Sequence, residues 1–223
     1  MDLLRNLQNV KEKIHRAAAR AGRDPESVKL IVVVKEASLE QVKLLSELGV
    51  TDLAENYAQQ LVKKYEVAPN AVWHFIGRIQ TNKIKYVVPR CEYIHSVFRE
   101  QEMAEIDRMA SKVNKIQKVF IEVNVAGEKS KAGVEPERIR DLLNSSQKYR
   151  AIEVVGLMTM APFVEDAQQV RWVFRKLREL RDELSKDWPK LVHLSMGMTN
   201  DYEVAIEEGA TMVRIGRAVL QGG

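Results

Sequence analysis

The chain has 223 residues, 45% hydrophobic and 30% charged, a composition that suits one globular domain with a sizeable core. Its net charge is only +4, from 35 Lys and Arg against 31 Asp and Glu. The sequence has no dense block of basic residues, so it gives no indication of a nucleic-acid partner. The single Cys91 excludes an internal disulfide, and no Cys/His cluster is present to hold zinc. No apolar run approaches the roughly 18 residues of a membrane span. We therefore expect a cytoplasmic protein without a membrane partner.

A helix is predicted first, over residues 2–21, because apolar residues recur on one face and Gly22 stands just past its end. A strand at 29–34 follows, and then a helix that starts with a capping box formed by Ser38 and Gln41. The same alternation predicts further strands at 51–54, 72–76, 92–96, 117–124, 152–157, 191–194 and 211–215. The clearest later helices lie at 99–113, 135–148 and 166–185.

This alternation predicts the fold class. Strands separated by helices form parallel sheets, and eight such units within one α/β domain, residues 1–223, favour a (β/α)8 TIM barrel. Only eight residues follow Ile215, too few for a full last helix, so the N-terminal helix is expected to close the ring. The competing architecture is an open doubly wound sheet, but no GxGxxG motif follows the first strand.

Polar residues and glycines follow almost every predicted strand. The carboxyl ends of barrel strands form one mouth, and function collects there. The residues at these strand ends are Lys35, Glu55, Asn56, His74, Gly77, Gln80, His95, Ser96, Asn124, Met158, Thr159, Ser195, Gly197, Thr199, Asn200, Arg214, Gly216 and Arg217. Met158 is the one apolar side chain among them. Because so many converge on one mouth, we expect a ligand pocket there.

The last two strand ends suggest a phosphate site. The segment SMGMT offers the hydroxyls of Ser195 and Thr199, and Gly197 lets the backbone approach a ligand closely. The segment IGRA offers the N–H groups of Gly216 and Arg217 at a helix start, where an anion is favoured. Taken singly, each could be an ordinary turn or cap residue, but together, after strands seven and eight, they favour phosphate.

A lysine beside a phosphate site has a chemical use. Apolar residues precede Lys35, and partial desolvation would lower the pKa of its amine and make it a better nucleophile towards carbonyls. An aldehyde that also carries a phosphate is pyridoxal 5′-phosphate, for which lysine is the usual protein partner. The alternative is a snorkelling or ion-paired lysine, with Glu36 as its partner, which is the commoner arrangement for a single lysine.

The ordered motifs resemble the YggS/PROSC family of pyridoxal-phosphate-binding proteins, also called pyridoxal phosphate homeostasis proteins. The motifs that carry the resemblance span nearly the whole chain: VVVK, ENYAQQ, WHFIGRIQTNK, HS, NVAGEKSKAG, GLMTMAP, LSMGMTNDYEVAI and GATMVRIGRAV. The resemblance implies fold type III, the barrel of alanine racemase and bacterial ornithine decarboxylase, and places Glu128 and Lys131 near the pocket mouth. Family members often read Ser-Lys-x-x-Pro, whereas here Val34 precedes Lys35 and Ser38 replaces the proline.

The resemblance also implies which residues bind the cofactor: Lys35, Asn56, Met158, Ser195, Gly197, Thr199, Arg214, Gly216 and Arg217. Lys35 would carry pyridoxal 5′-phosphate as a covalent aldimine, and Arg214 would face the pyridine nitrogen. Asn56 and Met158 would line the ring. The phosphate would bind the residues of SMGMT and IGRA, in the latter largely through backbone N–H groups.

The implied function is reversible binding of pyridoxal 5′-phosphate for its buffering or delivery, with cofactor-dependent apoenzymes as candidate recipients and with no catalytic residue. A monomer or a weak homodimer is expected. One alternative is an amino-acid racemase; another is a barrel enzyme that uses Lys35 on a sugar phosphate. A racemase needs acid–base groups on both faces of the ring, and in alanine racemase one comes from a second domain for which this chain has no room. Tyr57 is the nearest candidate base, but its position favours outer packing.

Three other features receive structural interpretations. His74 and His95 are expected to be buried, hydrogen-bonded histidines rather than ligand contacts. The arginines of the 166–185 helix are expected to form an exposed charged face interleaved with carboxylates.

Overall fold

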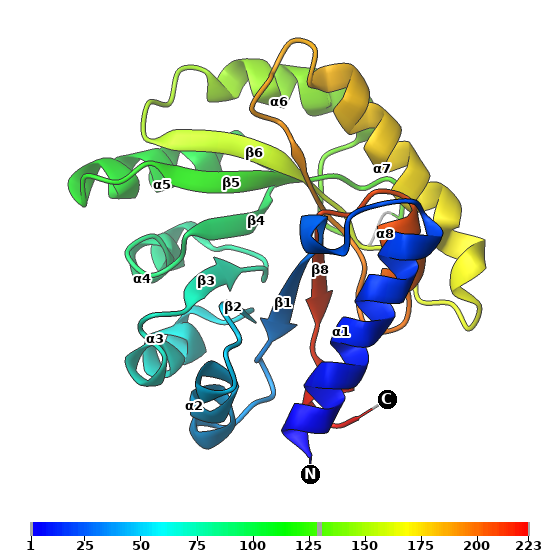
Figure 1. Ribbon diagram of the computed structural model, residues 1–223. Coiled ribbons are helices and arrows are strands. Elements are labelled where there is room, and N and C mark those ends of the chain that lie inside the picture. The colour runs from blue at the N-terminus through cyan, green and yellow to red at the C-terminus, as the bar shows by residue number, and fades with distance from the viewer. Residues whose placement is uncertain (1, 129–130, 223) are drawn as a thin grey trace.

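The computed structural model describes residues 2–128 and 131–222, and its centre is a closed barrel of eight parallel strands. Each strand pairs with the next in sequence, and the last pairs with the first (Figure 1). The strands are β1 (Lys29–Val33), β2 (Asp52–Glu55), β3 (Val72–Phe75), β4 (Tyr93–Val97), β5 (Gln117–Glu122), β6 (Ile152–Met158), β7 (His193–Ser195) and β8 (Met212–Ile215). The predicted (β/α)8 barrel is therefore confirmed, with strand boundaries close to those expected from the sequence.

Helices cover the outside of the barrel. They are α1 (Leu3–Arg20), α2 (Leu39–Glu47), α3 (Ala58–Val67), α4 (Ile84–Val87), α5 (Glu100–Lys112), α6 (Ile139–Ser146), α7 (Arg171–Leu184), α8 (Tyr202–Glu207) and α9 (Arg217–Leu220). Short 3₁₀ turns lie at Pro25–Ser27, Thr81–Lys83, Pro136–Arg138 and Ala167–Val170, so the predicted helices 135–148 and 166–185 each begin with a tighter turn. In the part of the chain that the structure describes, no helix combines the length and apolarity needed to span a membrane.

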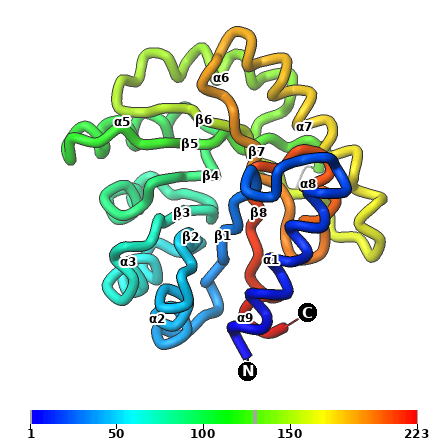
Figure 2. The backbone as a smooth tube through the Cα atoms, in the orientation of Figure 1, coloured from blue at the N-terminus to red at the C-terminus, as the bar shows by residue number. Residues whose placement is uncertain are grey.

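The N-terminal helix closes the ring, as the sequence predicts. Helix α1 packs against α8 and α9, and the first and last segments of the chain run side by side in Figure 2. Its buried face consists of Leu3, Leu7, Val10, Ile14, Ala17 and Ala18. The Asn6 side chain donates a hydrogen bond of 3.1 Å to the carbonyl of Val219, which joins α1 to the single turn of α9.

The inner face of the barrel sets the direction of the functional side chains. A small apolar cluster fills the inside, and it includes Ile31, Val33, Ala54, Phe120, Val155, Met158 and Met212. Because side chains alternate along a strand, the face of β8 that carries Met212 also carries Arg214. Lys35 and Asn56 lie just beyond the ends of β1 and β2, whose inner faces carry Ile31, Val33 and Ala54. The carboxyl ends of three strands therefore lead to polar residues.

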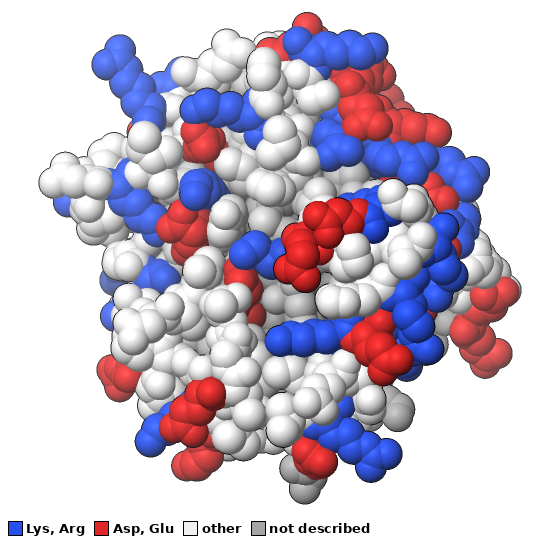
Figure 3. All heavy atoms as spheres, in the orientation of Figure 1, with Lys and Arg blue, Asp and Glu red and all other residues white. Residues whose placement is uncertain are grey.

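Charged residues of both signs are mixed over the face shown in Figure 3. The sequence predicts an exposed charged face for the arginines of α7, but three of them form ion pairs with a buried carboxylate. Arg171, Arg175 and Arg178 all lie within 3.1 Å of the buried carboxylate of Glu208, next to α8. This cluster joins α7 to α8 and accounts for the arginines without a nucleic-acid ligand.

Candidate functional site

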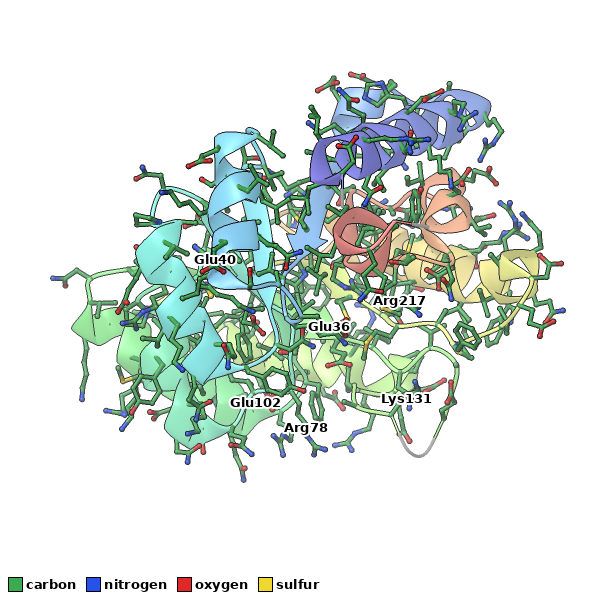
Figure 4. All side chains as sticks on the ribbon, turned by 90° about the horizontal axis from the view of Figure 1, so that it is seen from below. Glu36, Glu40, Arg78, Glu102, Lys131 and Arg217 are labelled. Atoms are coloured by element: carbon green, nitrogen blue, oxygen red, sulfur yellow. The ribbon has the colours of Figure 1, made fainter. Side chains whose placement is uncertain are left out.

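The candidate site is the mouth formed by the carboxyl ends of the strands. Figure 4 views this end of the molecule, and labelled side chains from segments that follow four different strands lie around it. Glu36 follows β1, Arg78 follows β3, Lys131 belongs to the loop after β5, and Arg217 follows β8. The convergence of strand ends that the sequence predicts is therefore observed.

Lys35 lies in the exposed turn that follows β1, two residues after the end of the strand. Its Nζ is 3.7 Å from Glu36 Oε1, and 46% of its side chain is exposed. The partner is the one named in the ion-pair alternative, and the exposure means that desolvation is incomplete. The amine is therefore accessible to a ligand, and its pairing does not distinguish a binding lysine from a surface one.

A buried ion pair holds the loops that carry Lys35 and Asn56. Lys64 Nζ, on α3, donates to Glu55 Oε2 at 2.7 Å and to the backbone carbonyl of Val34. The other oxygen, Glu55 Oε1, accepts from the backbone N–H of Asn56 at 2.7 Å. Sequence reasoning missed Lys64. The signal was available, because a lysine on the apolar stripe of an amphipathic helix must find a buried partner.

Asn56 has the only side-chain oxygen of the predicted cofactor residues that is buried and unpaired within the described part of the chain. Its backbone is approached so closely by Gly77 that a Cβ there would lie 2.0 Å from the Asn56 carbonyl oxygen. Buried polar atoms are nearly always hydrogen-bonded, so an orphaned acceptor beside a mouth fits a bound ligand. Met158, at the end of β6, is buried in the inner cluster and can pack against the same ligand.

Polar side chains also cross the barrel interior below the mouth. His74 Nε2 lies 2.9 Å from Asp52 Oδ1, and His74 Nδ1 lies 2.9 Å from His95 Nε2. His95 Nδ1 lies 2.7 Å from Ser195 Oγ, which accepts a hydrogen bond of 2.6 Å from Arg214 Nη1. The prediction that both histidines are buried and hydrogen-bonded is confirmed. Asp52 was not predicted, because nothing in its local sequence shows which side chain it meets across the barrel.

Burial sets the charges in this interior. It lowers the pKa of His95 well below its ordinary value and lowers that of His74, so both rings are neutral. Burial also lowers the pKa of Arg214 to about 10, which leaves the guanidinium charged at neutral pH. Beside it, burial raises the pKa of Glu122 to about 7, although the charge of Arg214 opposes that rise. The barrel interior therefore contains a cation and a carboxyl group that is partly protonated near neutral pH.

The structure gives Ser195 a different position from the one expected for a phosphate ligand. Its side chain is fully buried as the last residue of β7, and its hydroxyl is occupied by His95 and Arg214. This placement argues against a phosphate-binding role for Ser195 Oγ. Thr199, four residues further on, lies beyond the strand and is partly exposed.

The remaining phosphate candidates follow the ends of two neighbouring strands, β7 and β8. Gly197 has a φ of +95°, and a Cβ there would lie 2.7 Å from that of Ala205, so the turn needs glycine. Its carbonyl accepts from the N–H of Arg214 at 3.0 Å, which joins the ends of β7 and β8. A Cβ on Gly216 would lie 3.2 Å from the Val33 carbonyl oxygen, so the start of α9 sits close to the end of β1.

Other predicted residues have structural or peripheral positions. Ser96 Oγ donates to the Gly77 carbonyl at 2.6 Å, and the Asn124 amide donates to the Glu128 carbonyl at 2.9 Å. Tyr57, expected to pack in an outer layer, is instead 61% exposed. Side chains that are exposed at or near the mouth are Gln80, Lys131, Asn200 and Arg217. Residues 129–130 of the NVAGEKSKAG motif lie outside the described residues.

Known proteins match the chain over nearly its whole length. The family model described as alanine racemase, N-terminal domain, matches residues 5–222. The chain is 46% identical over 219 residues to the pyridoxal phosphate homeostasis protein of Aquifex aeolicus (strain VF5), covering 97% of this chain and 96% of that protein. PipY of Synechococcus elongatus PCC7942, solved with PLP bound, is 29% identical with a TM-score of 0.81, covering 93% of this chain and 99% of that one. An alanine racemase of Clostridium difficile 630 shares the fold, with 16% identity, a TM-score of 0.76, and coverage of 98% of this chain and 56% of that one.

Proposed function

Because the chain belongs to the family of pyridoxal phosphate homeostasis proteins, we propose that it binds pyridoxal 5′-phosphate reversibly and buffers or delivers it. The observation that carries the proposal is the placement of Lys35, Asn56 and Arg214 at the carboxyl end of the barrel, the first two in the loops after β1 and β2 and the third within β8. An accessible amine, an unpaired amide oxygen and a buried cation suit a ligand with an aldehyde and a ring nitrogen. The PLP-bound relative PipY, which has the same fold, supports this assignment.

In this proposal Lys35 Nζ would hold the aldehyde group of the cofactor covalently, with the carbonyl oxygen leaving as water. The ion pair with Glu36 is solvent-exposed and 3.7 Å long, so it is weak and costs little to break when the ligand arrives. The buried pair of Lys64 and Glu55 keeps the backbone beneath the amine in place. The lysine is therefore mobile at its tip and fixed at its base.

Arg214 takes the ring nitrogen in the same proposal. A guanidinium can only donate and stays protonated, so it leaves the ring nitrogen without a proton of its own. Asn56 and Met158 flank the ring from β2 and β6. An unprotonated ring withdraws electrons poorly, which suits a protein that holds the cofactor more than one that uses it for carbanion chemistry.

The phosphate is assigned to Thr199 Oγ1 and to the N–H groups of Gly216 and Arg217. The first N–H groups of a helix have no partner inside it, and α9 begins at Arg217. Gly197 shapes the turn that brings Thr199 towards α9. Ser195, whose hydroxyl is occupied in the barrel interior, is left out of this assignment.

The test is an absorbance spectrum of the purified protein before and after borohydride reduction. The protein should carry a visible band that reduction abolishes, and mass spectrometry should then find the cofactor's mass on the peptide that contains Lys35. Lys35→Ala should lose the band, whereas Lys43→Ala, at an exposed lysine of α2, should keep it. An unchanged band in Lys35→Ala would reject the assignment of this lysine.

We also propose that the protein turns over amino acids slowly or not at all, since its relatives are named for homeostasis and not for a reaction. Turnover needs a second proton-transfer group and a clamp for the substrate carboxylate, and a missing acid–base group costs about 10²–10⁴ in rate. Deuterium exchange at the α-carbon of a panel of amino acids measures this directly. Rapid exchange that Lys35→Ala abolishes would favour the racemase alternative. A cytoplasmic location and a monomer or weak homodimer remain predictions.

A further inference from the structure

Five polar side chains from five strands form one continuous hydrogen-bonded series across the barrel interior. They are Asp52 (β2), His74 (β3), His95 (β4), Ser195 (β7) and Arg214 (β8), and none is more than 3% exposed. Successive links measure 2.9, 2.9, 2.7 and 2.6 Å. Barrel interiors are usually filled by branched apolar residues, and buried polar groups are costly unless fully paired. A polar interior at this position therefore calls for a specific explanation.

The direction of every link follows from the two ends. Arg214 has no acceptor, so it must donate to Ser195 Oγ. The single hydroxyl proton of Ser195 is then free to be donated to His95 Nδ1, which accepts it if the ring is neutral. A neutral His95 carries its one proton on Nε2 and donates it to His74 Nδ1. His74 in turn carries its proton on Nε2 and donates it to Asp52.

The opposite end requires the same direction. Burial is the largest influence and raises the pKa of Asp52, but the hydrogen bonds and charges of His74, Thr51 and Lys29 together lower it, so the carboxylate is ionised and can only accept. Its second oxygen accepts from Thr51 Oγ1 at 2.7 Å and from Lys29 Nζ at 3.1 Å. The donor-only arginine and the acceptor-only carboxylate thus select one tautomer for each histidine.

Stacking fixes the planes of both rings. His95 lies against Phe120 with centroids 4.3 Å apart and an interplanar angle of 15°. His74 lies against Tyr93 at 4.8 Å and 11°. Because each ring is held by two hydrogen bonds and one aromatic face, the series cannot relax by rotating a ring. Ser195 Oγ is consequently held at a fixed point beneath the guanidinium.

We infer that Asp52, His74, His95 and Ser195 are positioning residues that hold the Arg214 guanidinium in one orientation through hydrogen bonds all donated towards Asp52. Arg214 Nη2 completes the anchoring by donating to the Thr159 carbonyl at 3.0 Å. No hydrogen bond joins Arg214 Nε to any residue that the structure describes, so donor capacity remains for a ligand. The identity of that ligand as a pyridine nitrogen rests on the proposed function, whereas the orientation of the arginine does not.

Ring ¹⁵N NMR of the ligand-free protein tests the direction of the series. With its four histidines labelled and assigned by His→Gln variants, His74 and His95 should both be neutral near neutral pH with the proton on Nε2. A proton on Nδ1 of either ring, or a positive charge on either ring, would reverse a link and overturn the inference. This measurement uses the wild-type chain, so it does not depend on whether any variant folds.

A matched pair of variants tests the positioning of Arg214. His95→Leu removes both hydrogen bonds, whereas His95→Gln keeps one acceptor and one donor. His95→Leu should shift the Arg214 Nε–H resonance and weaken binding of pyridoxal 5′-phosphate about tenfold or more, since a buried partner is left unsatisfied. His95→Gln should recover most of both. Gln117→Leu, which removes a buried polar side chain of β5 outside the series, controls for a general loss of stability.

The outcomes separate this inference from the proposed function. Equal changes in His95→Leu and Gln117→Leu, or an unmoved Arg214 resonance in His95→Leu, would assign His95 to packing alone and overturn the inference. If the wild-type protein binds no pyridoxal 5′-phosphate, the proposed function fails, while the tautomers and the Arg214 resonance still decide whether the series orients the guanidinium.

Discussion

Lys64 Nζ lies 2.7 Å from Glu55 Oε2, and the two side chains are only 3% and 0% exposed. The pair sits behind the loops that carry Lys35 and Asn56, and it bonds to the backbone of both. A buried ion pair adds little net stability compared with well-packed apolar residues, because desolvation offsets the attraction. Its value here is geometric, since it sets the spacing between the amine-bearing loop and the amide-bearing loop.

Removing one partner of this pair should therefore be costly. Lys64→Met leaves the buried carboxylate of Glu55 without its cation, and we expect the free energy of unfolding to fall by about 3–5 kcal/mol in urea denaturation. Adding Glu55→Gln should recover much of the loss, because the buried charge is then absent. Lys43→Met, at a lysine that is 67% exposed, is the control and should change little. If Lys64→Met unfolds with the wild-type free energy, the ion pair does not stabilise the fold.

The phosphate assignment predicts a difference between two ligands. A charge-assisted hydrogen bond contributes roughly 1.5–3 kcal/mol, so Thr199→Ala should weaken binding of pyridoxal 5′-phosphate about tenfold or more. Binding of unphosphorylated pyridoxal should hardly change. Titrations followed by absorbance measure both affinities, with Thr81→Ala at the start of a 3₁₀ turn as the control. Equal losses for both ligands would place the phosphate elsewhere.

Burial of a neutral His95 predicts a pH dependence of stability. The unfolded chain takes up a proton at this residue near its ordinary pKa of 6.5, whereas the folded state resists it. Below that pH the unfolded state binds more protons, so stability falls as pH decreases. His95→Gln should remove up to about 1.4 kcal/mol per pH unit of this slope. Urea denaturation at several pH values measures the difference, and His74 and His193, which shift in the same direction, remain in both proteins. Parallel curves would contradict a neutral native histidine.

The raised pKa of Glu122 predicts a pH dependence of stability with the opposite sign to that of His95. Its folded-state pKa of about 7 lies above its ordinary value of 4.5, so the folded state binds more protons between these values. Stability from this group is present at low pH and is lost as pH rises from about 4.5 through 7. Glu122→Gln should therefore gain on the wild type as pH rises, by as much as about 3 kcal/mol, and the gain should level off above pH 7. A gain that instead grows as pH falls would show that the carboxyl is ionised in the fold.

The barrel could be predicted from the sequence because its evidence is local. Most strands show a short apolar run and the long helices show a 3.6-residue period, so the order of elements follows without knowledge of long-range contacts. The place of Lys35 just after β1 also follows locally, since the apolar run of that strand ends directly before it. The approximate mouth of the site was therefore within reach.

The contacts across the barrel could not be predicted. Asp52 and His74 meet because β2 and β3 pair in a particular register, and His95 meets Ser195 across the interior at a separation of 100 residues. Two hydroxyls in SMGMT looked equivalent from the sequence. Only the structure shows that β7 ends at Ser195, whose side chain is buried, and that Thr199 lies beyond the turn at Gly197 and is partly exposed.

The closure of the ring by α1 has a consequence for biosynthesis. The Asn6 side chain bonds to Val219 across 213 positions of sequence, and β1 pairs with β8, so the first elements made find their partners among the last. During translation the apolar face of α1 has no native surface to cover it until the C-terminal residues emerge from the ribosome. Docking of this helix can therefore begin only after α8 and α9 have been synthesised, and contacts of such long sequence separation favour slow folding. Until then α1 presents an apolar face on one side, and on the other side exposed charged residues such as Lys11 and Arg16.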